Sequence, residues 1–213
     1  MNVDVLLYDG FDELDGIGPY EVFDYAGGYL AEDDADGRSL AVRYVTLDER
    51  DWVTASHGTR VGIDGVLPDP SAADAPDLLV VPGGGWTARD EDASAWAEAK
   101  KGDVPRALAE YHDAGVRIGT VCTGAMLLAE AGITDGRRAI THASAVAELR
   151  DSGAEVVEAR VVDDGDLVTA GGVTSGIDLA LYLVEREFGA PLAERIATVM
   201  EHERRGTVAD DPA

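Results

Sequence analysis

The chain has 213 residues, of which 46% are hydrophobic, and its 42 Asp and Glu outnumber its 17 Lys and Arg to give a net charge of −25. This length and apolar content suit a single globular domain with a real core. The negative charge argues against a nucleic-acid partner, because few cations are available to neutralise phosphates. The single cysteine, Cys122, excludes an intrachain disulfide framework and a multi-cysteine zinc site.

Targeting and charge patterns indicate where such a chain would work. No apolar run reaches the roughly 18 to 20 residues that a membrane-spanning helix needs, and segment 1–10 lacks the basic and apolar regions of a signal peptide. We therefore expect a soluble, cytoplasmic protein with a reduced thiol and no membrane contact. Only two of the cations are lysines, and the acidic residues are spread along the whole chain. This pattern predicts a halophilic protein whose self-repulsion is screened by molar salt; an ordinary acidic protein is the alternative.

Strand and helix patterns alternate along the first half of the chain. The expected elements are, in order, a strand at 3–8, a helix that Gly18 and Pro19 open and that runs to 25, an acidic loop at 32–37, a strand at 40–47, a hairpin at 52–63 and a strand at 77–81. The helix start is placed at Gly18–Pro19 because proline is tolerated in the first turn, where its missing N–H is harmless.

The alternation continues in the second half. The expected elements are helices at 104–114, 123–131 and 143–151, a strand at 116–121 before the second of these, strands at 155–162 and 167–170, a helix with an apolar stripe from Ile177 to Phe188, and a last helix that begins at Pro191. Ser175 and Asp178 resemble a capping box at the start of the striped helix. We predict one domain over residues 1–204 and a polar, frayed C-terminal tail at 205–213.

Strands that alternate with helices predict an α/β fold with a mostly parallel sheet covered on both faces. Ligands of such sheets bind at the carboxyl ends of the strands. Three segments fall at such ends, namely 9–18, 82–86 and 121–123. They are therefore expected to converge although they are far apart in sequence.

Cys122 lies between a strand pattern and a helix pattern, with Gly119 before it and Gly124 after it. This arrangement is typical of a nucleophile elbow, the sharp turn that presents a reactive side chain at the edge of a sheet. The helix N-terminus would place free N–H groups and partial positive charge beside the sulfur. We therefore predict a reactive thiol with a lowered pKa; a buried, inert cysteine is the alternative.

Backbone donors could complete this site. The turn Gly83–Gly84–Gly85 follows a strand and can aim an N–H toward the same pocket. With the N–H of Thr123 it would offer two donors to developing negative charge. Without other evidence, such a glycine turn is also compatible with turn chemistry alone.

Four carboxyl groups follow the first strand, and one of them could serve as a general acid or base. They are Asp9, Asp12, Glu13 and Asp15. Position alone does not choose among them, and a solvated acidic loop is the alternative. The apolar neighbours of Asp15 could bury it, which would raise the pKa of its carboxyl.

Histidines and metal-site spacings contribute little to the predicted site. His142 follows Cys122 by twenty positions and could approach it, although we expect a structural role for this side chain; the residue directly after the cysteine is Thr123. No set of His, Asp and Cys has the spacing of a metal site. We therefore predict no metal and no cofactor.

These motifs together resemble the ThiJ/PfpI superfamily, whose flavodoxin-like fold is related to that of class I glutamine amidotransferases. The resemblance extends from Val3 to about Phe188 and rests on three segments, DLLVVPGGG at 77–85, IGTVCTGAMLLAEAGITDGRRAITH at 118–142 and TAGGVTSGIDLALYLVE at 169–185. Thr123 directly after the cysteine and LDGIGPYEVF at 14–23 are similar to the isocyanide hydratase subgroup.

The resemblance implies roles for individual residues. Cys122 would be the nucleophile, Asp15 its acidic partner and Thr123 a polar neighbour, with Gly84 as the favoured second backbone donor and Gly83 and Gly85 as alternatives. It also implies a homodimer that acts on a small-molecule substrate. The segment 87–103, which follows the glycine turn, could reshape the mouth of the pocket.

The activity implied by the resemblance is the hydration of an isocyanide, R–NC, to an N-substituted formamide through a thioimidate on the cysteine. Two other hypotheses stay open. One is glyoxalase-like or amidase-like chemistry by the same thiol, with the missing neighbouring histidine arguing against amides. The other is a non-enzymatic stress or redox protein that works through oxidation of the cysteine.

Overall fold

The computed structural model describes residues 1–33, 37–206 and 208–209 of the chain. Its main sheet contains the strands β1 (Asn2–Leu6), β2 (Ala41–Thr46), β5 (Gly65–Val66), β6 (Leu78–Val81), β7 (Arg117–Val121), β10 (Val161–Asp163), β11 (Leu167–Ala170) and β12 (Val208–Ala209). They lie in the order β12-β10-β11-β7-β6-β1-β2-β5. Every pair is parallel except β10 with β11, which confirms a mostly parallel sheet.

Two small sheets accompany the main one. The hairpin expected at 52–63 is confirmed by β3 (Trp52–Thr54) and β4 (Arg60–Gly62), which pair antiparallel. The strands β8 (Arg138–Ala139) and β9 (Glu155–Val156) pair parallel to each other.

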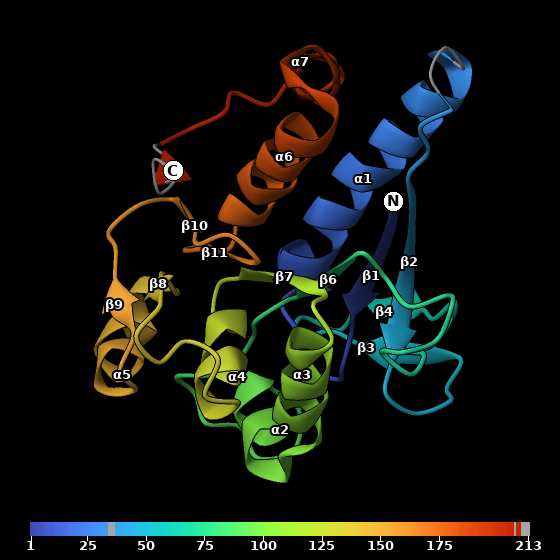
Figure 1. Ribbon diagram of the computed structural model, residues 1–213. Coiled ribbons are helices and arrows are strands. Elements are labelled where there is room, and N and C mark those ends of the chain that lie inside the picture. The colour runs from blue at the N-terminus through green and yellow to red at the C-terminus, as the bar shows by residue number, and fades with distance from the viewer. Residues whose placement is uncertain (34–36, 207, 210–213) are drawn as a thin grey trace.

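Helices cover both faces of the main sheet. They are α1 (Glu13–Asp33), α2 (Ala95–Lys101), α3 (Asp103–Asp113), α4 (Gly124–Glu130), α5 (Val146–Asp151), which follows the 3-10 turn η1 (Ala143–Ala145), α6 (Ser175–Phe188) and α7 (Ala190–Val199). Figure 1 shows α1, α6 and α7 on one side of the sheet and α2, α3 and α4 on the other. This two-sided covering explains why β6 reads as a continuous apolar run, since all of its residues are buried.

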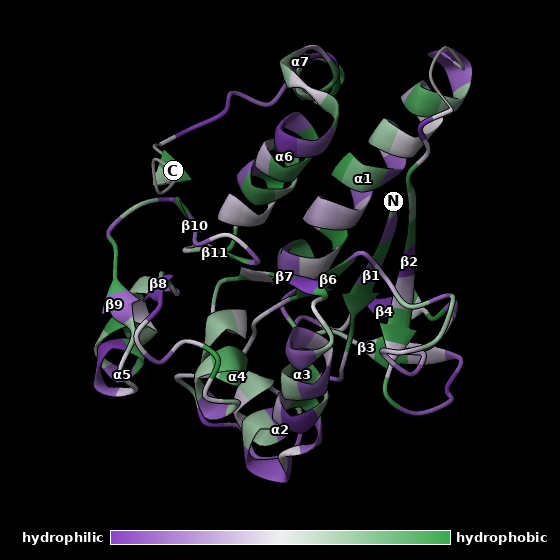
Figure 2. Cartoon of the chain, viewed as in Figure 1, coloured by the Kyte–Doolittle hydropathy of each residue, from purple (hydrophilic) through white to green (hydrophobic). Residues whose placement is uncertain are grey.

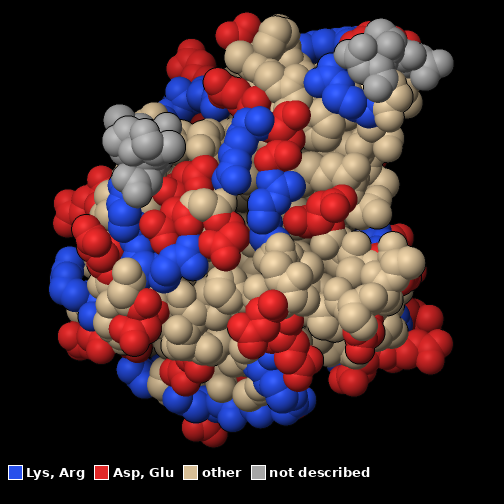
Figure 3. Space-filling model, in the orientation of Figure 1, with Lys and Arg blue, Asp and Glu red and all other residues tan. Residues whose placement is uncertain are grey.

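The pattern of burial follows the pattern of hydropathy. On α3 the buried side chains Val104, Leu108 and Tyr111 recur at helical spacing and face the sheet. In Figure 2 the hydrophilic residues mark the loop after α7 and the outer turns of the helices. Figure 3 shows acidic and basic residues interspersed over the visible face, with no single acidic patch.

The start of α1 differs from the prediction. The helix begins at Glu13 and not at Gly18–Pro19, and Pro19 lies inside it. The Asp12 side chain accepts the N–H of Leu14 at 3.2 Å and thus supports the earlier start. Pro19 removes only one helical hydrogen bond, the one to the carbonyl of Asp15.

Other segments also depart from the expected pattern. The capping box is wrong: Thr174 precedes α6 without a side-chain cap, and the Asp178 carboxylate instead binds the Arg160 guanidinium at 2.6 Å. A charge-assisted bond of this kind is stronger than a neutral cap. Within the tail predicted to fray, residues 208–209 pair with β10. Of the acidic loop at 32–37, the first two residues end α1, whereas 34–36 lie outside the described residues.

The order of the strands positions the functional site. β2 lies on one side of β1, whereas β6, the next strand of the main sheet after β5, lies on the other. The connections that leave β1 and β6 therefore diverge at a topological switch point, where α/β sheets bind ligands. The segments 7–12 and 82–86 lie at this point, and β7, which pairs with β6, ends at Val121 directly before Cys122.

Candidate active site

Cys122 occupies a sharp turn between β7 and α4. Its φ is +57°, a left-handed conformation that a residue other than glycine rarely adopts. The backbone is held there by three hydrogen bonds: its N–H donates to the Ala170 carbonyl at 3.0 Å, and its carbonyl accepts the Thr141 hydroxyl at 2.9 Å and the His142 N–H at 3.3 Å. Strain that is fixed in this way is characteristic of a nucleophile elbow. Cys122 is only 6% exposed.

Asp15 faces Cys122 from the first turn of α1 and is completely buried. Its Oδ2 accepts the N–H of Gly83 at 3.0 Å. Its Oδ1 is also buried and has no hydrogen-bond partner among the residues that the structure describes. The Cys122 thiol lies close enough to this carboxyl for each of the two groups to shift the pKa of the other. The nearest chemical partner of the cysteine is therefore a carboxyl group, not a histidine.

Burial decides the proton affinity of this pair. Loss of solvent raises the pKa of Asp15 to about 8, the charge of Asp12 adds to the effect, and the Gly83 N–H and the neighbouring Cys122 thiol oppose it. The Asp15 carboxyl thus exchanges its proton near neutral pH, where a general acid or base works best.

The lowered thiol pKa predicted from the sequence is wrong for this resting site. Burial raises the pKa of the Cys122 thiol, and the nearby Asp15 charge raises it further. The Thr123 N–H at the start of α4 acts in the opposite direction and lowers the pKa of the thiol, but by less. The resting cysteine is consequently a neutral thiol next to a carboxyl that can take its proton.

The glycine turn contacts both partners of the pair. Gly83 donates to Asp15, and a Cβ on Gly83 would lie 2.4 Å from the Thr123 backbone N, so only glycine fits there. The N–H of Gly84 donates to the Thr123 hydroxyl at 3.0 Å. Gly84, the favoured second oxyanion donor, is therefore already engaged. Of the three glycines, Gly85 is the one whose N–H has no hydrogen-bond partner within the described part of the chain.

The other three carboxyl candidates are engaged with partners other than the thiol. Asp12 caps α1, and its N–H binds the Gly83 carbonyl at 2.8 Å. Asp9 pairs with Arg50 at 3.1 Å. Burial opposes ionisation of Glu13, but hydrogen bonds from His57 and nearby backbone N–H groups lower its pKa to about 2. Glu13 thus fastens the β3–β4 turn to the start of α1.

The segments on either side of the cysteine are linked to each other. The Trp86 indole N–H donates to Glu148 Oε2 at 3.1 Å, and the Thr87 and Ser144 hydroxyls are 2.8 Å apart. The Nδ1 of the His142 ring binds the Ser144 hydroxyl, also at 2.8 Å. The start of segment 87–103 is therefore fastened beside the nucleophile, and α2 lies further along it.

Tyr8 is a residue of this site that sequence reasoning missed. Its hydroxyl donates to the Pro82 carbonyl at 2.7 Å, and its side chain is buried behind the pair, close enough for Asp15 and Cys122 to raise its pKa after the larger effect of burial. Its position at the end of the strand predicted at 3–8, two residues before Gly10, was the available signal.

The described residues contain neither a metal-ligand cluster nor a membrane-spanning helix. Within the described residues, no three His, Cys, Asp or Glu side chains are grouped so that they could hold a metal ion. No helix in the same part of the chain combines the length and apolar character needed to cross a bilayer.

The chain is similar in sequence and in fold to proteins of the DJ-1/PfpI type. The model of the DJ-1/PfpI family matches residues 1–186. Isonitrile hydratase of Pseudomonas putida is 31% identical over 207 residues, which cover 95% of this chain and 78% of that protein. A ThiJ/PfpI family protein from Pseudomonas syringae superposes with a TM-score of 0.78 at 24% identity over 100% of this chain and 77% of that one. DJ-1 of Schizosaccharomyces pombe gives 0.76 at 18% identity over 95% and 100%. At these identities, the similarity to the two structures supports the fold alone.

Proposed function

The chain belongs to the DJ-1/PfpI family, and within that family we propose that it is a cysteine-dependent hydratase that adds water to isocyanides (isonitriles). The observation that carries the proposal is the buried pair of Asp15 and Cys122 at the strand-to-helix turn. The similarity to isonitrile hydratase over 95% of the chain supports the choice of substrate.

The first half of the reaction forms a carbon–sulfur bond. The ionised Asp15 carboxylate takes the proton of the Cys122 thiol as the sulfur attacks the terminal carbon of R–NC. The same proton then passes from Asp15 to that carbon, which gives the thioimidate S–CH=N–R. Transfer through Asp15 suits a thiol whose pKa burial raises, because the free thiolate need not accumulate.

The second half breaks this bond with water. Asp15 takes a proton from water as the oxygen adds to the thioimidate carbon, and the nitrogen receives that proton. The tetrahedral species then expels the sulfur, its hydroxyl proton returns to the Asp15–Cys122 pair, and R–NH–CHO leaves. The sum is R–NC plus H₂O to the formamide, with the pair restored.

Backbone groups assist the sulfur in both halves. The Thr123 N–H lowers the pKa of the sulfur and would stabilise its charge when it leaves. Gly83 holds Asp15 in place through a bond of 3.0 Å. Pre-formed donors of this type need no reorganisation as charge develops.

Turnover of simple isocyanides tests the proposal. Purified protein in molar KCl is incubated with an alkyl and an aryl isocyanide, and the formamide is followed by NMR. We expect turnover by the wild type, none by Cys122→Ala, and a loss of about 10²- to 10⁴-fold in Asp15→Asn, the range of general acid–base catalysis. A wild type no faster than Cys122→Ala would overturn the proposal.

The alternative chemistries are separated in the same samples. Conversion of methylglyoxal to lactate in place of formamide formation would favour glyoxalase-like chemistry. Selective oxidation of Cys122 by mild peroxide, with neither turnover, would favour a redox role. A homodimer stays part of the proposal, and light scattering in molar KCl measures it.

A further inference from the structure

Tyr8 and Asp15 bind opposite ends of one peptide group. The Tyr8 hydroxyl donates to the Pro82 carbonyl at 2.7 Å, and the N–H of Gly83 donates to Asp15 Oδ2 at 3.0 Å. That carbonyl and that N–H belong to the same peptide unit, and the structure contains no cis peptide bond among the described residues. The two groups of a trans peptide point in opposite directions, so the unit forms a straight relay from the phenol to the carboxyl.

We propose that Tyr8 is a positioning residue for Asp15. Its hydroxyl holds and polarises the Pro82–Gly83 peptide group, whose N–H binds the Asp15 carboxylate. The inference rests on the proposed pairing of Asp15 with Cys122, but not on the identity of the substrate. Tyr8 itself touches neither the substrate nor the reacting atoms in this account.

The relay acts on the charged form of Asp15. A hydrogen bond to the carbonyl of a peptide polarises the unit and makes its N–H a stronger donor. The Gly83 N–H is the one backbone donor to Asp15 among the described residues, so a change in its strength or direction acts directly on the carboxylate. Tyr8 thereby favours ionisation of Asp15, against the effect of burial.

The environment protects this relay from water and from competing partners. Tyr8 is 4% exposed and Asp15 is completely buried. Glycine at position 84 allows the turn to approach the 10–12 segment, since a Cβ there would lie 2.5 Å from the Gly10 carbonyl oxygen. The turn that carries the Pro82–Gly83 peptide is thus packed against the 10–12 segment, and the Tyr8 hydroxyl binds the carbonyl of that peptide.

Other titratable groups near the relay are the same with and without the Tyr8 hydroxyl. Asp12 and Cys122 act on Asp15, and Tyr8 is additionally affected by Glu98. Because Tyr8 is uncharged at the pH values of interest, Tyr8→Phe changes no charge at the site. A change in the Asp15 titration then reports the hydrogen bond and not a new electrostatic neighbour.

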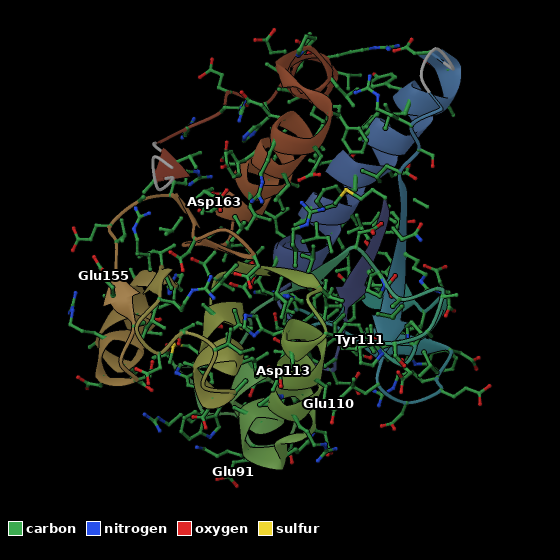
Figure 4. All side chains as sticks on the ribbon, viewed as in Figure 1. Glu91, Glu110, Tyr111, Asp113, Glu155 and Asp163 are labelled. Carbon is green, nitrogen blue, oxygen red and sulfur yellow. The ribbon has the colours of Figure 1, made fainter. Side chains whose placement is uncertain are left out.

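The chain offers a matched control. Tyr111 on α3, labelled in Figure 4, is 2% exposed, and its hydroxyl also donates to a proline carbonyl, that of Pro68. Tyr111→Phe therefore removes the same kind of bond from a buried tyrosine. Neither Asp15 nor Cys122 is among the groups that act on Tyr111.

Carbon-13 NMR of the aspartate carboxyl carbons tests the proposal in the full chain, with the Asp15 signal assigned by its loss in Asp15→Asn. In Tyr8→Phe we expect the pKa of Asp15 to rise by about 0.1 to 0.7 pH unit. This range corresponds to a loss of roughly a tenth to a third of the strength of the hydrogen bond from the Gly83 N–H to the charged carboxylate. In Tyr111→Phe we expect no rise. The pH midpoint of Cys122 alkylation should move with Asp15 in the first variant only.

The outcomes separate this inference from the proposed function. An Asp15 signal that is elevated in the wild type but unmoved or lowered in Tyr8→Phe, or moved equally in Tyr111→Phe, overturns the role of Tyr8. A wild-type signal near the ordinary aspartate value overturns the acid–base pair itself. If Tyr8→Phe does not fold, replacement of all tyrosines by 3-fluorotyrosine, a stronger donor of nearly the same shape, must lower the pKa of Asp15; no change overturns the proposal.

Discussion

Asp15→Asn should stabilise the folded chain while it impairs the reaction. The amide keeps an acceptor for the Gly83 N–H, which now binds Asp15 at 3.0 Å, and has nearly the same size as the carboxyl. It removes the need to bury a charge, which is the main reason that the pKa of Asp15 is raised to about 8. The substitution therefore separates the stability cost of the carboxylate from its chemical use.

The size of the effect follows from proton linkage. The pKa of Asp15 is 3.8 in the reference state and about 8 in the folded chain. Between these values the folded chain keeps a proton that the unfolded chain has lost, so raising the pH favours unfolding by about 1.4 kcal/mol per pH unit. The stabilisation of the protonated form is complete below pH 4 and lost above pH 8. Over the whole interval the carboxylate costs about 6 kcal/mol, and between pH 5 and pH 8 about 4 kcal/mol.

Denaturant unfolding in molar KCl at several pH values measures this cost. We expect the free energy of unfolding of Asp15→Asn to exceed that of the wild type by a margin that widens by about 4 kcal/mol from pH 5 to pH 8. Asp178→Asn is the control, since Asp178 is also buried but binds Arg160 at 2.6 Å. Asp178→Asn removes the negative charge that pairs with Arg160, so this variant should be less stable than the wild type. A constant margin for Asp15→Asn across this pH range would refute the buried, proton-holding carboxyl.

Three further predictions concern access, packing and charge. Ser144→Ala removes the 2.8 Å contact with Thr87, and we expect iodoacetamide to alkylate Cys122 about 2- to 10-fold faster, as the loss of one hydrogen bond allows. Gly83→Ala would place a Cβ 2.4 Å from the Thr123 backbone N and should lower the free energy of unfolding by about 1 to 3 kcal/mol. With a net charge of −25, the melting temperature should rise from low to molar KCl, because salt screens repulsion.

Matched controls decide each of these outcomes. Ser152→Ala removes a hydroxyl hydrogen bond at the end of α5 and should leave the alkylation rate unchanged. An equal acceleration in both variants would contradict the role of the Thr87–Ser144 contact in limiting access to Cys122. Gly62→Ala adds a methyl group with no heavy atom within 4 Å and should be nearly neutral. Equal melting temperatures at low and molar KCl would contradict the halophilic interpretation.

The alternation of strands and helices was sufficient to predict the sheet and the convergence of three distant loops. Apolar runs such as 77–81 identify buried strands, and a cysteine between a strand and a helix falls at the carboxyl edge by topology alone. The short helix α2 is not among the helices expected from the sequence, although its sequence carries signals for both of its ends. Ser94 caps its start by accepting the Ala97 N–H at 3.0 Å, and Gly102 ends it in a left-handed conformation.

The properties that depend on three-dimensional depth could not be predicted in this way. The helix start next to Cys122 is visible in the sequence and predicts a lowered pKa of the thiol. Burial and the facing carboxyl of Asp15, which the sequence does not show, have the larger, opposite effect. Likewise, the partner of the Gly84 N–H depends on where the Thr123 hydroxyl lies, a distance that no sequence pattern contains. The contacts of the Pro82–Gly83 peptide with Tyr8 and Asp15 likewise depend on distances that no sequence pattern contains.

The most direct test of the account is the mass of the Cys122-containing peptide after an acid quench of the reaction with an alkyl isocyanide. We expect it to gain the mass of one isocyanide molecule, the thioimidate on the sulfur, and the same peptide from Cys122→Ala to gain nothing. Formamide production with an unmodified Cys122 at every quench time, or an adduct on another residue, would contradict a mechanism centred on this thiol.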